Sequence, residues 1–348
     1  MAGTVHRRAA RPLVVAVVVV AAALITVALV YLQPSPRAPG AAVGAVIPAL
    51  ARGAGPVRRT VEPYAGLGAW VDGFDYGAAY QRAGAAPSIT PDVIDDLAAH
   101  GVRTLYLQAA REDTRTPEGI VDPATTAEML VRAHRVGMAV VAWYLPRFRD
   151  PAKDLANLRR LDRFAVLGHR FDGIAVDIEF TDDVPDTDER NALIIEMTAT
   201  FKADLGGDTL GAIVLPPVQT EVINTTLWPD FPWRALAPYY DVWMPMSYWT
   251  FRSEESGYAD GYTYNEESTR RLRTDLGDPD AAIHGIGGIG DLVTTNTLDG
   301  FARSLAATGS IGGSIYDWDS MTEATRDELA TRFATGGLAS DLPDPPIR

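Results

Sequence analysis

The chain has 348 residues, of which 47% are hydrophobic, and a formal net charge of -14 at pH 7. This length and composition suffice for one large domain with accessory segments. The acidic balance argues against nucleic acid as a partner, and the absence of cysteine excludes a disulfide scaffold and thiolate chemistry. The five histidines show no metal-ligand spacing, so we expect neither a metal nor a cofactor.

The N-terminal part of the chain is typical of a membrane anchor. Residues 1–12 carry Arg7, Arg8 and Arg11, and residues 13–32 form an apolar run without charge. A bilayer-spanning helix needs roughly 20 such residues. Arginines before the span favour a cytoplasmic N-terminus, so the sequence predicts a transmembrane helix with the following chain extracytoplasmic. A cleaved signal peptide is the alternative, because small residues follow at 41–45.

Residues 33–63 are rich in Pro, Ala and Gly, which predicts an extended linker. From residue 64 to residue 340, short apolar segments alternate with helical ones, and residues 341–348 form a tail. Strands are predicted over residues 66–74, 102–108, 138–145, 171–179, 210–215, 242–247, 282–287 and 313–317. Helices are predicted to open at Thr90-Pro91, Asp122-Pro123 and Asp150-Pro151, and to cover residues 187–205, 266–276, 297–308 and 322–333.

Eight such strand–helix units indicate a (β/α)8 TIM barrel in the α/β class. A doubly wound open sheet is the alternative. It requires a glycine-rich phosphate loop after the first strand, whereas Gly66 and Gly68 lie within that strand.

The fourth predicted strand, residues 171–179, ends in acid. Strand side chains alternate with period two, so Ala175, Asp177 and Glu179 share one face. Two neighbouring carboxyl groups at a strand end are unfavourable unless they are used or paired. One of them is therefore expected to be protonated, as a general acid near neutral pH requires.

Catalytic groups of a TIM barrel cluster at the carboxyl ends of its strands. Besides Asp177 and Glu179, these ends carry candidate substrate-binding residues: Asp72, Asp75, Gln108, Arg111, Tyr144, Gln219, Met246, Tyr248, Trp249, Asp317 and Trp318. Sugar rings stack on aromatic faces, and their hydroxyls bond carboxylates and amides, so the set suits a carbohydrate. In the alternative interpretation the aromatic residues pack the rim, and Asp72 or Asp75 caps a turn.

The segment from Asp172 to Glu179 (DGIAVDIE) resembles the strand-four signature D-G-x-D-x-D-x-E of glycoside hydrolase family 18, the chitinase-like enzymes. The segment MPMSYW ending at Trp249 is similar to the strand-six M-x-Y-D segment of that family. The resemblance implies that Glu179 donates a proton, Asp177 orients the N-acetyl group of the substrate, and Tyr248 holds the acetamido oxygen. That family uses substrate-assisted catalysis.

The chain departs from the family pattern at four places. Ala175 replaces an acid that supports Asp177, and VVAWY at residues 140–144 replaces the strand-three S-x-G-G. Trp249 replaces the aspartate after the strand-six tyrosine. Both Tyr316 and Trp318 match the strand-eight tryptophan.

We therefore expect a membrane-anchored extracytoplasmic glycoside hydrolase that acts on a cell-wall or environmental glycan, with N-acetylhexosamine polymers among its candidate substrates. The alternative is a catalytically silent barrel that binds glycan at the cell envelope. A third hypothesis is a hydrolase with another sugar preference, in which Glu179 works with a partner carboxylate from Asp72, Asp75 or Asp317.

Overall fold

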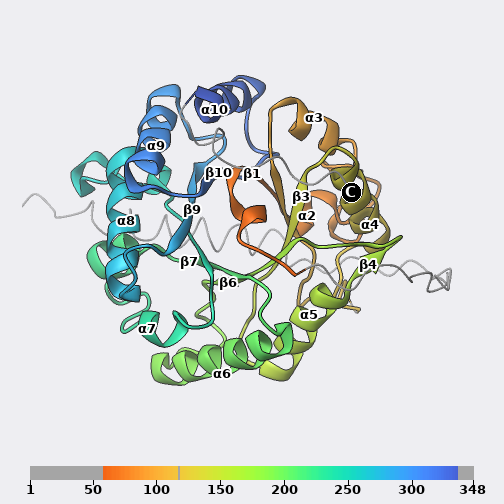
Figure 1. Cartoon of the computed structure of the whole chain (residues 1–348), viewed down its shortest axis with the longest axis horizontal. Coiled ribbons are helices and arrows are strands. Elements are labelled where there is room, and N and C mark those ends of the chain that lie inside the picture. Colours follow the sequence, from red (N-terminus) through yellow and green to blue (C-terminus); the bar gives the residue numbers. More distant parts are fainter. Residues whose placement is uncertain (1–57, 117, 336–348) are drawn as a thin grey trace, which may run out of the picture. The chain divides into compact units, whose positions relative to one another are not determined.

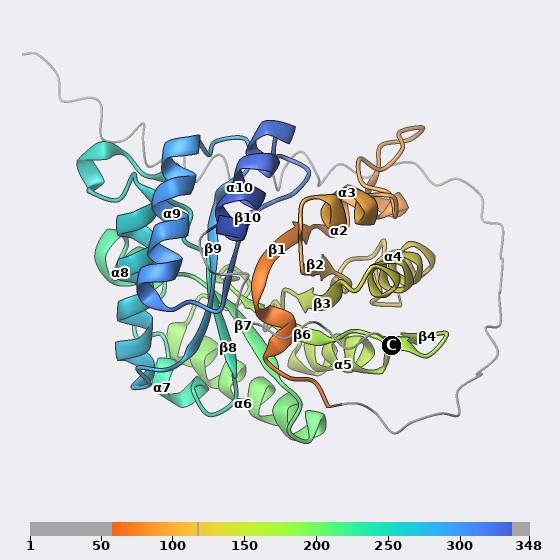
Figure 2. The same cartoon turned by 45° about the horizontal axis from the view of Figure 1, so that its top comes forward.

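The computed structural model describes residues 58–116 and 118–335. Eight parallel strands close into a barrel in the order β1-β10-β9-β8-β7-β6-β3-β2. They are β1 (Gly66–Val71), β2 (Thr104–Gln108), β3 (Ala139–Tyr144), β6 (Gly173–Ile178), β7 (Leu210–Val214), β8 (Val242–Pro245), β9 (Ala282–Ile289) and β10 (Gly312–Tyr316). Figures 1 and 2 show the strands at the centre and the helices around them. The predicted (β/α)8 barrel is confirmed.

The surrounding helices are α3 (Val93–Ala99), α4 (Pro123–Arg135), α5 (Pro151–Arg163), α6 (Thr187–Leu205), α8 (Gly261–Leu276), α9 (Thr295–Thr308) and α10 (Glu323–Thr335), with short helices α2 (Gly73–Tyr76) and α7 (Trp233–Leu236). Two of the predicted start signals act as expected. The side chains of Asp122 and Asp150 accept backbone N–H groups in the first turns of α4 and α5. The helix predicted to open at Thr90 begins at Val93.

Several boundaries differ from the prediction: α8 begins at Gly261, β8 ends at Pro245 and β9 ends at Ile289. The first strand ends at Val71, because Asp72 caps α2 directly after it. The helix that opens at Asp150-Pro151 is predicted to run to about residue 168. Helix α5 ends instead at Arg163, and a small antiparallel hairpin of β4 (Ala165–Val166) and β5 (His169–Arg170) follows. Its turn contains Gly168 at φ +85, a backbone conformation that glycine adopts without strain.

The strands separate two layers of buried side chains. On β6, Ile174, Val176 and Ile178 pack outward against the helices, whereas Ala175 lies with the inner cluster. The inner cluster fills the barrel with Tyr64, Trp70, Tyr106, Val141, Trp143, Ala175, Ile213, Val242, Met244, Met246 and Ile286. The period-two alternation predicted for this strand is confirmed, so the next inward positions are those of Asp177 and Glu179.

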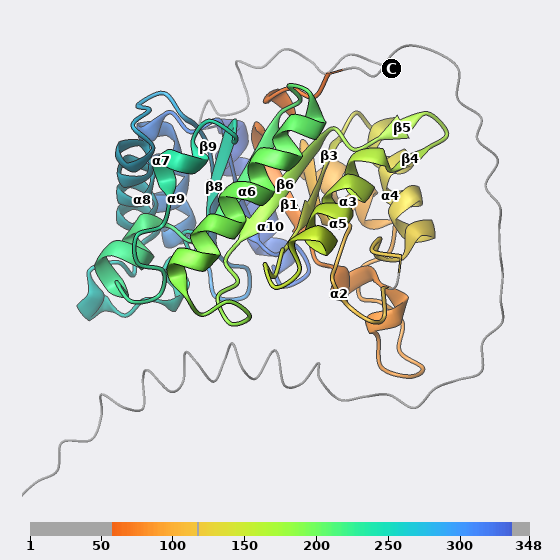
Figure 3. The ribbon, with the colours of Figure 1, turned by 90° about the horizontal axis from the view of Figure 1, so that it is seen from below.

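The amino ends of the strands are closed by the segment that enters the barrel. In the 3-10 helix η1 (Glu62–Tyr64), the hydroxyl of Tyr64 donates to the carbonyl of Ile174 at 2.8 Å and accepts its N–H at 3.0 Å. Close by, the guanidinium of Arg59 contacts Asp162 at 2.6 Å and Asp208 at 3.1 Å. In the side view of Figure 3, this entering segment and α2 lie at opposite ends of the barrel.

Within residues 58–116 and 118–335, no helix combines the length and apolar character that crossing a membrane would require. The transmembrane helix predicted over residues 13–32 lies outside the described residues, as do most of the predicted linker and the tail at 341–348.

Candidate active site

Asp177 and Glu179 lie at the carboxyl end of β6, on its inward face. Asp177 is 5% exposed, and its Oδ1 has no hydrogen-bond partner among the described residues. Burial raises the pKa of Asp177 well above its usual value, and the charges of Glu179 and Asp72 add to this effect. Burial, followed by the charge of Asp72, raises the pKa of Glu179 to about 7. A carboxyl group with this pKa carries a proton at neutral pH in a large fraction of molecules.

Asp72 and Asp75 follow β1 at the same opening of the barrel, formed by the carboxyl ends of its strands and called the mouth below. Asp72 is the N-cap of α2, and its Oδ1 accepts the N–H of Phe74 at 3.0 Å. In return, Oδ2 of Asp75 accepts the N–H of Asp72 at 2.9 Å, which completes a capping box. The cap interpretation therefore holds for both residues. Burial, then the charges of Asp72 and Asp317, raise the pKa of Asp75 to about 8.

Two tyrosines line the mouth between these carboxyl groups. The Tyr316 hydroxyl donates to Oδ2 of Asp72 at 2.9 Å. The rings of Tyr248 and Tyr316 lie 6.0 Å apart between centroids. Burial raises the pKa of Tyr248 well above its usual value, with further contributions from the charges of Glu179 and Asp177. Tyr248 therefore lies close enough to both carboxyl groups to feel their charge, and its hydroxyl stays protonated.

Aromatic residues form a floor beneath the carboxyl groups. Trp70 stacks on Tyr106 with ring centroids 4.4 Å apart and meets Trp143 edge-on at 5.9 Å. The Trp70 indole donates to the hydroxyl of Ser314 at 2.7 Å, and the same hydroxyl bonds His284 at 2.9 Å. The sequence analysis missed Trp70 and Trp143 as site residues. The alternation of side chains along a strand was the available signal. Trp70 of β1 lies two residues before Asp72 and therefore shares its face.

Gln108 and Arg111 support the α2 turn from β2. Oε1 of Gln108 accepts the N–H of Gly73 at 3.1 Å and a guanidinium N–H of Arg111 at 2.8 Å. Arg111 also lies over the ring of Phe74, 4.1 Å from its centroid. These two predicted site residues thus lie beside the mouth and hold the turn that carries Asp72.

Three predicted binding residues do not line the mouth. Tyr144 faces outward, where its hydroxyl donates to Asp154 and accepts from Asn157, because the inward positions of β3 are 141 and 143. Trp249 is 1% exposed and packs on Phe301 of α9 with ring centroids 5.2 Å apart. Trp318 is fully buried, and its indole donates to Asp96 of α3 at 2.8 Å. Their predicted placement for sugar stacking is wrong.

The remaining predicted residues are Met246, Gln219 and Asp317, which lie in three different segments of the chain. Met246 belongs to the inner cluster of the barrel. Gln219 lies in the π-helix η3 (Val218–Ile223), and its buried Oε1 has no partner in the part of the chain that the structure describes. Asp317 follows β10, and its Oδ1 accepts the N–H of Ser320 at 2.9 Å. Burial raises its pKa, and the bonds from Ser320 oppose that shift.

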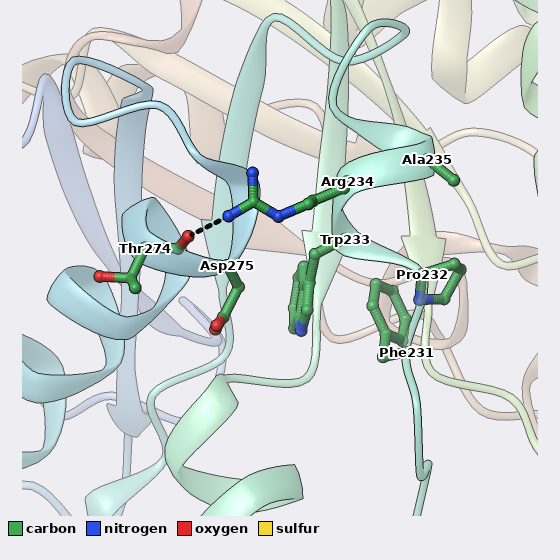
Figure 4. Close-up of a pocket in the computed structure, with 7 residues that line it drawn as sticks. All are labelled: Phe231, Pro232, Trp233, Arg234, Ala235, Thr274 and Asp275. Carbon is green, nitrogen blue, oxygen red and sulfur yellow. Dashed lines mark hydrogen bonds between the residues drawn. The ribbon is translucent and has the colours of Figure 1, made fainter.

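A surface pocket of about 390 Å³ lies elsewhere, on the outer wall between α7 and α8. Figure 4 shows Arg234 reaching across it towards the carbonyl of Thr274, at 3.4 Å. The lining residues are Phe231, Pro232, Trp233, Arg234, Ala235, Thr274 and Asp275. None of them belongs to the barrel mouth, so the chemistry described above does not extend to this pocket.

Known proteins resemble this chain in structure and not in sequence. No protein-family model matches it, and no curated protein does so. Among solved structures, an endo-1,4-β-D-mannanase from Thermotoga petrophila crystallised with maltose and glycerol is 11% identical, with a TM-score of 0.58 over 78% of this chain and 99% of that one.

Two further similar structures are a chitinase and a spore cortex-lytic enzyme. A family 18 chitinase from Cycas revoluta in complex with (GlcNAc)4 is 11% identical, with a TM-score of 0.53 over 78% of this chain and 100% of that one. The spore cortex-lytic enzyme SleL of Bacillus cereus is 10% identical, with a TM-score of 0.52 over 77% of this chain and 74% of that one. The chain thus has the TIM-barrel fold found in chitinases and mannanases, and it is divergent from them in sequence.

Proposed function

We propose that this protein is a glycoside hydrolase in which Glu179 is the general acid. The observation that carries the proposal is the environment of Glu179, which directly follows β6, lies in the barrel mouth and has a pKa of about 7. A general acid needs a pKa near the working pH, and burial among other carboxyl groups produces it here. Asp177 and Tyr248 add polar groups within electrostatic reach.

A glycan is the proposed substrate because of the fold and the chemistry of the mouth. The similar structures include a mannanase and a chitinase bound to (GlcNAc)4. The mouth offers carboxyl and phenol groups to sugar hydroxyls above an aromatic floor. The apolar run at 13–32 behind three arginines supports an extracytoplasmic domain on a membrane anchor, facing a cell-wall or environmental glycan.

The test is the turnover of Glu179→Gln on chitohexaose and mannohexaose. A general acid contributes typically 10²–10⁴-fold, so we expect turnover to fall by about that factor while oligosaccharide binding persists. Glu254→Gln is the matched control, because Glu254 is exposed in the short helix η5 (Glu254–Ser256). Hydrolysis that survives Glu179→Gln undiminished would locate the active site elsewhere.

A second candidate is a catalytically silent glycan-binding barrel at the cell envelope. Ala175 favours it, because this residue replaces the acid that supports Asp177 in the resembling family. Binding of either oligosaccharide without any hydrolysis by the wild-type protein would support this candidate against the first.

A further inference from the structure

Asp72 and Glu179 enter the mouth from different walls of the barrel. Going round the barrel through β2 and β3, β6 is the third strand after β1. Both residues follow inward-facing strand positions, and the charge of Asp72 raises the pKa of Glu179. A sugar ring bound between these walls would meet one carboxyl group on each side.

The Asp72 carboxylate is held in place at both oxygens. Oδ1 accepts the N–H of Phe74 at 3.0 Å, and Oδ2 accepts the hydroxyl of Tyr316 at 2.9 Å. Each oxygen thus accepts one hydrogen bond from the wall and keeps a lone pair for a further donor such as a water molecule.

The other acids of the mouth are poorly suited to accept a proton from a water molecule. Asp75, with a pKa of about 8, is largely protonated at neutral pH, and its Oδ2 is occupied by the Asp72 backbone. Asp177 is almost fully buried, with a strongly raised pKa. Asp317 also has a raised pKa, and its Oδ1 is bonded to its own turn at Ser320.

We propose that Asp72 is the second catalytic carboxylate, a general base that activates water for inverting hydrolysis opposite Glu179. This inference rests on the proposed function. The aspartate side chain is one methylene shorter than a glutamate, and both of its oxygens are bound to the wall. The strands β2 and β3 lie between β1 and β6, so the two carboxyl groups enter from different walls. Carboxyl groups separated widely enough to hold a water molecule between them are the arrangement of inverting enzymes.

The step balances without a co-reactant. Asp72 removes a proton from water while the water oxygen bonds to the anomeric carbon. The bond from that carbon to the leaving oxygen breaks, and the leaving oxygen takes the proton of Glu179. The products leave Asp72 protonated and Glu179 ionised, and proton exchange with solvent restores both.

A consequence concerns the class of substrate. A water activated by Asp72 replaces the internal acetamido nucleophile, so the cleaved sugar needs no 2-acetamido group. The loss of the supporting acid at Ala175 fits this difference, since Asp177 then has no acetamido group to orient. Mannohexaose is accordingly the probe on which we expect the higher turnover.

The experiment uses the full-length protein with Asp72→Asn and Asp72→Ser, assayed on mannohexaose and chitohexaose. Asn and Ser both serve as N-caps, so the α2 turn is kept while the carboxylate is lost. We expect kcat to fall by about 10²–10⁴-fold on the cleaved probe, with unchanged binding, as for the loss of a general base. Proton NMR of the first wild-type products should show inverted anomeric configuration.

Asp280→Asn is the matched control, because Asp280 is exposed in the loop before β9, at the amino ends of the strands, and the charge change is the same. We expect its turnover to stay within about twofold of wild type, as is usual for surface substitutions away from a site. Retained turnover in both folded Asp72 variants, or retention of anomeric configuration, would overturn the assignment of Asp72. Loss in Glu179→Gln alone would leave the proposed function standing, whereas no hydrolysis of either probe by the wild type would overturn both.

Discussion

Trp143 of β3 and Ala175 of β6 are register partners on adjacent strands, and both side chains belong to the inner cluster of the barrel. Two departures from the chitinase-like pattern, the segment at residues 140–144 and the alanine at 175, therefore lie side by side in the barrel. An indole lies beside the position from which a carboxyl group is missing. The indole N–H of Trp143 has no partner among the residues that the structure describes, so its polar edge remains available beneath the mouth.

This pairing predicts that the missing acid cannot simply be restored. Ala175→Asp would add a buried carboxyl group next to the indole, and we expect it to lower the free energy of unfolding by about 3 kcal/mol or more. Urea denaturation at pH 7 measures the change. In a double-mutant cycle with Trp143→Ser, the double variant should lose less stability than the sum of the two single losses, because the smaller residue leaves room for water beside the new carboxyl group. A single variant as stable as wild type would contradict this packing.

The buried positions of Trp249 and Trp318 predict structural and not binding phenotypes. Replacing either tryptophan with Ala should destabilise the protein by about 3–5 kcal/mol, the usual range for a large core side chain. Oligosaccharide affinity of the folded fraction should be unchanged. Phe251→Ala is the control, because Phe251 is 49% exposed in the 3-10 helix η4 (Trp249–Phe251) that also contains Trp249. A loss of affinity at full stability would instead indicate a stacking role.

These tryptophans also show where sequence reasoning stops. Period two correctly predicted the two faces of β6, because this regular strand packs Ile174, Val176 and Ile178 outward and Ala175 into the inner cluster. Trp249 and Trp318 lie beyond the last residues of β8 and β10, where the chain turns and no period applies.

The prediction that Tyr144 lines the mouth was wrong for a related reason. The predicted strand at 138–145 is apolar on both faces, so its sequence does not reveal which set of side chains points inward. By contrast, Asp72 and Asp75 have the spacing of a capping box, and that pattern was readable.

The raised pKa of Glu179 predicts a pH-dependent stability. A carboxyl group whose folded-state pKa exceeds its unfolded value stabilises the fold below the unfolded pKa, and this contribution is lost as pH rises towards the folded pKa. For Glu179 the window runs from its ordinary value of 4.5 to about 7. Glu179→Gln lacks this loss, so from pH 4 to pH 8 it should gain about 2–3 kcal/mol relative to wild type.

Denaturant unfolding of both proteins across this range measures that difference, and Glu254→Gln provides the background. In the same window, wild-type turnover should decline above about pH 7, when the general acid loses its proton. A constant difference in stability between the two proteins would contradict the buried, protonated state of Glu179.

The apolar run at residues 13–32 predicts the topology of the protein. Fractionation should recover it with membranes, and protease added to intact cells should release the barrel domain, because Arg7, Arg8 and Arg11 favour a cytoplasmic N-terminus. Replacing these arginines with glutamate should weaken that orientation. A mature protein that begins after residue 32 would identify a cleaved signal peptide instead.

Arg59 and Tyr64 close the end of the barrel that lies opposite the mouth. Both residues bind the amino ends of the strands, whereas the carboxyl groups lie at the other ends. The described chain therefore enters the barrel at the end opposite the mouth. In the membrane-anchored hydrolase proposed above, a linker that joins the described chain at residue 58 would leave the mouth unobstructed for a polymeric substrate.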